Sequence, residues 1–240
     1  MSELFSIQLQ NRQQQGRDGV WLDLPTTTEQ VQAALRQIGI SSDNPQGLFI
    51  SGYFAEEEKR FAISYNMVLA SNVDELNFLA SRLETLSTGE RAELNAALQA
   101  PQSELFSIGR ITDFPENVEY YVYLPDVRGP AQLGDYYLNR SGMVDMPEEW
   151  KGGIDTAQFG RYVTQQEQGA FTQYGYLVKS GDEWQKVYEG QPVPEEYRVL
   201  SFPASEILRD AANIPPPVQP ETELQKVIPI ILNGKDSVER

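Results

Sequence analysis

Apolar and polar residues alternate near the start of the chain, a pattern typical of half-buried β-strands. Residues 4–10 and 20–24 both alternate in this way, and Gly and Asp residues between them supply turn signals. Two short apolar runs, 48–50 and 61–63, indicate two more strands on either side of a Glu-rich loop. The first part of the chain is therefore predicted to hold four strands.

A helix is predicted between the second and third of these strands. Thr26 and Thr27 each precede a Glu or Gln by three residues, which is the spacing of a capping box. Apolar residues then recur at helical spacing as far as Gly39, a residue type that commonly ends a helix.

The next stretch is predicted to be helical throughout. Ser71 or Asn72 caps a segment with apolar residues at helical spacing, and residues 87–90 form a second capping box. This second helix continues to Pro101, and a short third helix is expected over residues 103–108. Helices of this length are unstable alone, so we expect them to pack on each other or on a sheet.

Further along, strand and helix signals are mixed. We expect a strand at 120–124, a helix at 133–140 and a short helix at 147–150. Residues 170–179 and 183–188, joined by Ser-Gly-Asp, read as a hairpin.

These elements predict an α+β fold in several parts. A helix at 205–212 and a proline-rich linker, which we expect to be mobile, follow the last strand. The predicted parts are an N-terminal α/β domain (1–70), a short helical bundle (71–115), a second α/β domain with a hairpin (116–205) and a Pro-rich tail (206–240).

Composition restricts the chemistry that the chain can perform. The 240 residues include 35 Asp and Glu against 19 Lys and Arg, a net charge of −16, with neither His nor Cys. The commonest general base, thiolate nucleophiles, zinc-thiolate sites and disulfides are therefore excluded. Phosphate-binding and dinucleotide-binding glycine patterns and calcium loops are also absent from the sequence. We expect a protein that is not an enzyme and holds no cofactor or metal.

The negative charge is spread along the chain. The four predicted parts carry net charges of −3, −4, −7 and −2 in order. Such a surface repels nucleic acid and attracts basic proteins. Two other interpretations stay open: an acidic adaptor for some other basic protein, and a hydrolase that uses a pair of carboxylates.

The sequence also bears on where the protein acts. Residues 1–10 lack a basic segment followed by an apolar core, and no window approaches 18 uninterrupted apolar residues. We therefore expect a cytoplasmic protein that does not enter membranes.

Seven segments are informative when they are taken in order. They are residues 19–25 (GVWLDLP), 49–53 (FISGY), 74–80 (DELNFLA), 133–137 (LGDYY), 159–161 (FGR), 174–176 (YGY) and 193–198 (VPEEYR). Their order and spacing resemble those of the ArdA family of antirestriction proteins over about residues 19–202. The resemblance implies an elongated, three-domain, homodimeric protein without catalytic activity that mimics bent duplex DNA. Such a protein occupies the DNA-binding groove of type I restriction–modification enzymes and protects incoming mobile genetic elements from cleavage.

The chain departs from the family pattern at positions where acids are usual. Gly52, Asn139, Arg140 and Tyr162 occupy these positions, and each departure removes a candidate phosphate mimic.

The remaining acids provide the candidate partner-binding residues. We expect ten of them to stand in for DNA phosphates: Glu75, Glu84, Glu90, Glu93, Asp126, Asp135, Asp145, Glu148, Glu149 and Asp155. Because the expected effect is a summed field, no single one of them should be essential.

Overall fold

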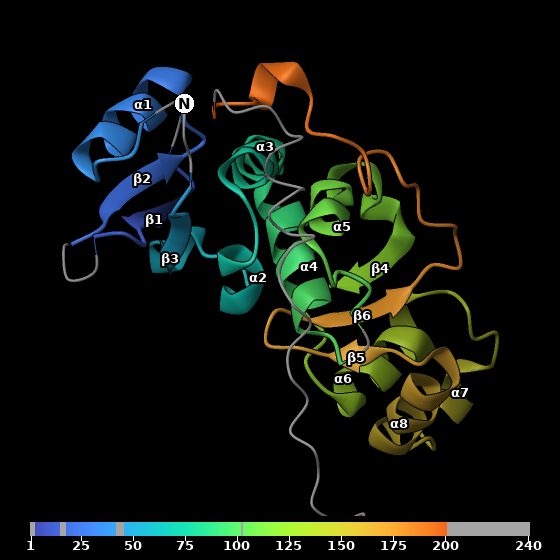
Figure 1. Cartoon of the computed structure of the whole chain (residues 1–240). Coiled ribbons are helices and arrows are strands. Elements are labelled where there is room, and N and C mark those ends of the chain that lie inside the picture. The colour runs from blue at the N-terminus through green and yellow to red at the C-terminus, as the bar shows by residue number, and fades with distance from the viewer. Residues whose placement is uncertain (1–2, 15–17, 42–45, 102, 201–240) are drawn as a thin grey trace, which may run out of the picture. The chain divides into compact units, whose positions relative to one another are not determined.

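A computed structural model of the chain describes residues 3–14, 18–41, 46–101 and 103–200 (Figure 1). This part has the predicted mixed α+β character. Its strands are β1 (Phe5–Asn11), β2 (Val20–Leu24), β3 (Leu48–Phe54), β4 (Tyr121–Leu124), β5 (Ala170–Phe171) and β6 (Tyr176–Lys179). Its α-helices are α1 (Thr28–Gln37), α2 (Tyr65–Leu69), α3 (Val73–Glu84), α4 (Thr88–Gln99), α5 (Ile108–Thr112), α6 (Pro130–Asp135), α7 (Glu148–Lys151) and α8 (Thr156–Glu167). Short turns of helix are η1 (Glu57–Lys59), η2 (Phe114–Glu116), η3 (Val118–Tyr120), η4 (Tyr136–Arg140, a π-turn) and η5 (Glu195–Tyr197).

The first sheet confirms three of the four strands predicted near the N-terminus. It is antiparallel with the order β2-β1-β3. Ile7 pairs with Leu22, and both are buried on the face that packs with the apolar side of α1. Gln8 pairs with Trp21 on the opposite face. The alternation read from the sequence therefore sets which face is buried.

The helix that covers this sheet begins and ends as its sequence predicts. Thr27 and Gln30 form a complete capping box at the start of α1. Gly39 follows the last turn with φ +69°, a left-handed conformation that glycine adopts without strain.

The predicted strand at 61–63 is wrong. Phe61 and Ile63 are buried, which produces the apolar pattern, but the segment pairs with no strand among the described residues. Instead, the Ala62 N–H donates to Asn95 Oδ1 at 2.7 Å, and Asn95 Nδ2 donates to the Arg60 carbonyl at 3.3 Å. A side chain of α4 therefore replaces the hydrogen bonds that a neighbouring strand would make.

The helical stretch is confirmed with one shift. Complete capping boxes start α3 at Asn72 and α4 at Ser87. The short third helix, predicted over 103–108, is instead α5, which begins at residue 108. Ser107 Oγ accepts a hydrogen bond from the Arg110 N–H at 3.2 Å, so Ser107 caps a helix that starts after it.

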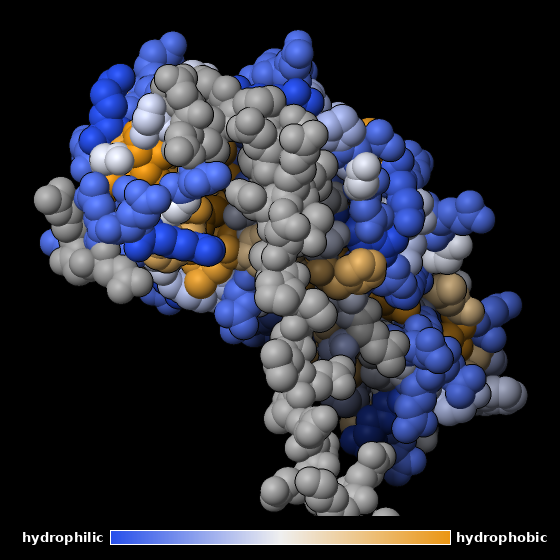
Figure 2. Space-filling model, viewed as in Figure 1, coloured by the Kyte–Doolittle hydropathy of each residue, from blue (hydrophilic) through white to orange (hydrophobic). Residues whose placement is uncertain are grey.

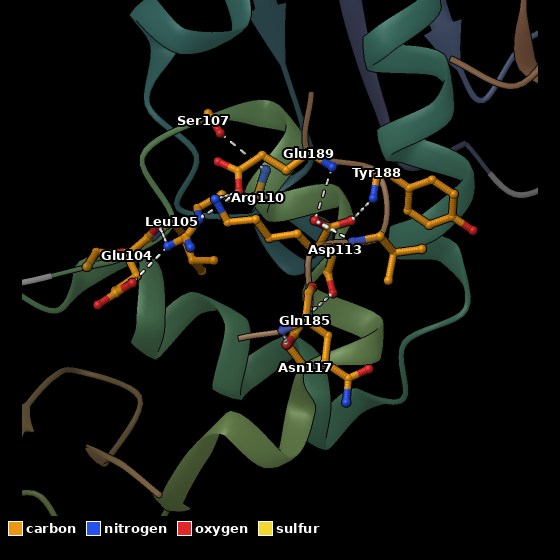
Figure 3. Close-up of polar contacts among 12 residues, drawn as sticks. Glu104, Leu105, Ser107, Arg110, Asp113, Asn117, Gln185, Tyr188 and Glu189 are labelled. Carbon is orange, nitrogen blue, oxygen red and sulfur yellow. Dashed lines mark hydrogen bonds and ion pairs between the residues drawn. The ribbon is translucent and has the colours of Figure 1, made fainter. Parts of the chain in front are cut away.

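The second sheet contains the predicted strand at 120–124 but only part of the predicted hairpin. Its order is β4-β6-β5, all antiparallel. Residues 183–188 form no strand. Their neighbourhood is held by side chains instead: Asp113 and Asn117 accept hydrogen bonds from backbone N–H groups between residues 185 and 189 (Figure 3). The hairpin prediction fails because these side-chain acceptors satisfy the backbone in place of a strand.

Two helices beside this sheet meet at glycines. A Cβ atom on Gly134 would lie 1.9 Å from the Thr156 carbonyl oxygen, and one on Gly160 would lie 1.8 Å from the Pro130 carbonyl oxygen. The backbones of α6 and α8 therefore touch where only glycine fits. Helix α8 has no counterpart among the predicted elements, whereas the helix predicted at 133–140 is present as α6 and η4, beginning at residue 130. The short helix predicted at 147–150 is present as α7.

One large hydrophobic cluster extends from Leu4 to Leu200 and contains side chains of the first sheet, α1, α3, α4 and α5. A smaller cluster consists of Val127, Leu133 of α6 and Tyr176 of the second sheet. The helix predicted at 205–212 and the Pro-rich tail lie outside the described residues.

Candidate acidic binding surface

The candidate acids at the N-termini of α3 and α4 are bonded to the backbone. A Glu75 carboxylate oxygen accepts from the Asn72 N–H at 3.4 Å, and one of Glu90 accepts from the Ser87 N–H at 2.7 Å. The hydrogen bonds from Ser87 lower the pKa of Glu90. The positive ends of their own helices offset part of the charge of both carboxylates.

Glu93, also on α4, is buried, with 8% of its surface exposed. Burial raises the pKa of its carboxyl to about 8, with a smaller contribution from the charge of Glu90. Glu93 is therefore mostly protonated at neutral pH and presents no charge to a partner. Glu84, at the end of α3, is half-buried.

Three candidate acids in the segment that connects β4 to α8 are exposed to solvent. Asp126, Asp145 and Glu149 are exposed and make no hydrogen bond or ion pair to another described residue. Glu119, which is not among the ten candidates chosen from the sequence, shares both properties. It follows Val118, a partly buried residue of the core, and sequence alone gives no signal that its carboxylate is free.

The other three candidates are at the surface but have local partners. Asp135 accepts from Asn139 Nδ2 at 2.8 Å and lies 3.3 Å from an Arg140 guanidinium nitrogen. The Glu148 carboxylate pairs with Lys151 Nζ at 2.6 Å. Asp155 caps α8, accepting from two backbone N–H groups at 2.9 and 3.0 Å. The departures at Asn139 and Arg140 therefore do more than remove acids, because both bind the neighbouring Asp135.

The departure at Gly52 has a packing reason. A Cβ atom at this position would lie 3.0 Å from Gln8 Cβ and 3.0 Å from Trp21 Cη2. The Trp21 ring thus reaches across the outer face of the first sheet to β3, where it leaves little room for an aspartate. At the fourth departure, Tyr162 is exposed on α8.

A separate set of acids is used inside the fold, where Figure 3 shows them around Arg110. The Arg110 guanidinium donates to Glu104 at 2.8 Å and to Glu189 at 3.3 Å, and it lies over the Trp184 ring at 5.1 Å. Lys179 and then Arg110 lower the pKa of Glu104. Asp113 is fully buried and accepts from the backbone N–H groups of residues 187, 188 and 189. Asp113 and Glu189 therefore position the 185–189 loop, Glu104 is paired with Arg110 and Lys179, and none of the three carboxylates is unpaired.

A family model described as antirestriction protein (ArdA) matches residues 15–178. The chain belongs to the ArdA family. The match contains the α3–α4 pair, the second sheet except for the last residue of β6, and the four exposed acids at 119, 126, 145 and 149. ArdA proteins are antirestriction proteins, and this is the general function that membership gives the chain. In a comparison with curated proteins, the sequence gives no significant match.

Three further observations describe this ArdA protein. Hydrophilic side chains cover most of the face seen in Figure 2, and apolar side chains are exposed in patches between them. Within the described ranges, no helix has the length and apolar character needed to cross a membrane. Nor do three or more acids of the described residues come together in a way that could hold a metal ion.

Proposed function

We propose that this ArdA protein inhibits type I restriction–modification enzymes by presenting carboxylates in place of DNA phosphates. The observation that carries the proposal is the set of exposed, unpaired acids at Glu119, Asp126, Asp145 and Glu149, which we call the exposed acids. Asp135, Glu148 and Asp155 lie in the same stretch and add surface charge, although each has a local partner. The partner surface is the DNA-binding groove of the enzyme, and the inhibitor acts in the cytoplasm as a homodimer.

The physical basis is a summed electrostatic field. Duplex DNA carries one charge per ~1.7 Å of helix axis, so a groove that binds it is strongly positive. A protein surface of excess negative charge is attracted to such a groove from a distance of about one Debye length, ~8 Å at physiological salt. The net charge of −16 supplies this field, and the exposed acids supply the points of contact.

The two alternatives make different demands. A carboxylate-pair hydrolase needs two close acids in a cleft. A small pocket lies between the end of β1 and the end of α1. Asp18 is the one acid among its lining residues, so the pocket lacks such a pair. An acidic adaptor needs only a basic partner, and it differs from an antirestriction protein in the identity of that partner.

Inhibition of a purified type I restriction enzyme tests the proposal. The full chain should inhibit cleavage of unmodified duplex DNA, and added duplex should relieve the inhibition because both compete for one groove. Inhibition should also weaken steeply as salt is raised from about 50 to 200 mM, since the contacts are ionic. Inhibition that is unchanged across this range, or that excess duplex does not relieve, would contradict DNA mimicry.

A further inference from the structure

Large apolar side chains are exposed among the acids that precede α8. Met143 is 74% exposed and Trp150 is 68% exposed, the two highest values for large apolar side chains among the described residues. Both lie in the stretch 143–155, which also carries the acids at 145, 148, 149 and 155. Single exposed apolar residues are common on proteins, so the exposure of Trp150 alone indicates no contact, and the acids around it have to be considered with it.

Local structure holds Trp150 in this position. It lies on α7, a single turn of helix, where its backbone N–H donates to the Pro147 carbonyl at 3.0 Å. Its own carbonyl accepts from the Gly153 N–H at 3.0 Å. The backbone on both sides is therefore fixed by hydrogen bonds while the indole points into solvent. An indole on a fixed backbone has only two side-chain torsions to restrict, so it loses little conformational entropy when a partner covers it.

We propose that residues 143–155 form a mixed contact in which Trp150 and Met143 anchor the restriction–modification enzyme and the surrounding acids attract it. This inference rests on the function proposed above and adds an apolar component to it. The occupant is the basic, DNA-contacting surface of that enzyme, in which an arginine guanidinium stacks on the Trp150 ring. Trp, Met and Arg are the residues enriched at the centres of protein interfaces.

Charge complementarity supports this occupant. The stretch holds four acids against one base, Lys151, and that base is already paired with Glu148 at 2.6 Å. Asp145 and Glu149 remain free to meet cations of the partner. A partner surface rich in arginine meets unpaired carboxylates and an aromatic face within this stretch, and each of these attracts a guanidinium.

Phe106 offers a matched control. It is 67% exposed, almost as much as Trp150, and it lies between Leu105 and Ser107 in the segment before α5. Its ring lies 5.0 Å from the Arg110 guanidinium, and the acid two residues before it, Glu104, is paired with Arg110 and Lys179. Phe106 therefore matches Trp150 as a large exposed aromatic side chain, but it lacks the neighbouring unpaired acids that the proposal requires.

The test is the affinity of the full chain for the purified methyltransferase core of a type I enzyme, measured by displacement of a fluorescent DNA duplex. Three variants are compared with the unaltered chain at low and high salt: Trp150→Ala, Glu149→Gln and Phe106→Ala. Trp150→Phe tests whether an aromatic ring is sufficient. Thermal unfolding of each variant confirms that these exposed substitutions leave the fold intact.

The expected results separate apolar from ionic contacts. Trp150→Ala should weaken binding about tenfold by the same factor at both salt concentrations, because a buried aromatic contact is not screened. Glu149→Gln should weaken it at low salt only, Trp150→Phe should retain most of the affinity, and Phe106→Ala should have little effect.

Two results overturn the inference, and they have different consequences. If the unaltered chain displaces DNA and Trp150→Ala binds equally well, the mixed contact is wrong and DNA mimicry by charge alone stands. If the unaltered chain fails to displace DNA at any salt concentration, the proposed function and this inference are both wrong.

Discussion

Two regions of the molecule use the same residue types in different ways. In the α3–α4 pair, the candidate acids are the four helix-pair acids: Glu75, Glu84, Glu90 and Glu93. Glu75 and Glu90 cap helices, Glu93 is buried, and Glu84 is half-buried. In the stretch from residue 119 to residue 149, the four exposed acids have no hydrogen bond or ion pair to another described residue. The first set stabilises the fold, and the second is available to a partner.

The difference arises from where each acid lies relative to regular structure. At a helix start, unpaired backbone N–H groups attract a carboxylate three residues later. Between elements, as at Asp126 and Asp145, the chain offers no such donor and the carboxylate stays in solvent. Counting charges along a sequence therefore overstates what the helical part can present to a partner.

The largest expected effect concerns how the second region is held together. Gly160→Ala places a methyl group 1.8 Å from the Pro130 carbonyl oxygen, so the backbones of α6 and α8 must separate. We expect the free energy of unfolding to fall by about 3 kcal/mol. Urea titration monitored by circular dichroism measures this change.

The first region supplies the control for that prediction. Gly89 lies in α4, where an added methyl group would have no atom within 4 Å, and Gly89→Ala should raise stability by about 0.5 kcal/mol. Equal effects from the two substitutions would show that the glycine contact does not hold α6 against α8.

A smaller effect concerns the buried acid of the first region. The pKa of Glu93 is raised from 4.5 to about 8 by burial, so the folded state binds a proton that the unfolded state releases between these pH values. Stability is therefore highest below pH 4.5 with respect to this group and is lost as pH rises toward 8. Glu93→Gln removes this loss and should be more stable than the unaltered chain by about 2 kcal/mol at pH 6, with little difference at pH 4.5.

Unfolding free energies measured from pH 4.5 to 8 check this prediction. Glu57→Gln, at an exposed carboxyl in η1, is the control and should follow the unaltered chain throughout. If Glu93→Gln also follows the unaltered chain, Glu93 is ionised in the folded protein and returns to the set of acids that a partner can contact.

One repeated peptide shows what sequence can and cannot predict about the fold. The residues Glu-Leu-Phe-Ser-Ile occur at 3–7 and at 104–108. In the first copy they enter β1, where Ser6 Oγ donates to Asp23 at 2.9 Å. In the second copy the serine, Ser107, caps α5. Capping boxes and alternation are local and were predicted correctly, whereas partners from distant segments decide between strand and helix in such a peptide.

Contacts with distant segments also explain why the strands predicted at 61–63 and 183–188 are wrong. The backbone at 61–63 and at 185–189 is satisfied by Asn95, Asp113 and Asn117, which lie at least 30 residues away in the chain. No local sequence pattern indicates that a distant side chain will make the hydrogen bonds that a neighbouring strand would otherwise make. Helix α8 was missed because its buried contact is made by Gly160, which carries no apolar signal.

For the candidate site, composition and family resemblance indicated an acidic binding surface, but not which acids are free. Glu93 was among the predicted contacts and is buried, whereas Glu119 was not among them and is exposed. The exposure of a carboxylate depends on how helices and strands pack, and the positions of the charges in the sequence do not indicate this packing.

The most direct test of the central claim compares two sets of four substitutions, each removing the same formal charge. One variant changes the exposed acids (Glu119→Gln, Asp126→Asn, Asp145→Asn and Glu149→Gln), and the other changes all four helix-pair acids to Gln. Affinity for the type I methyltransferase core is measured from about 50 to 200 mM salt. We predict that the exposed set weakens low-salt binding about tenfold and flattens its salt dependence, while the helix-pair set mainly changes stability. A loss of affinity that is as large for the helix-pair set would contradict the account.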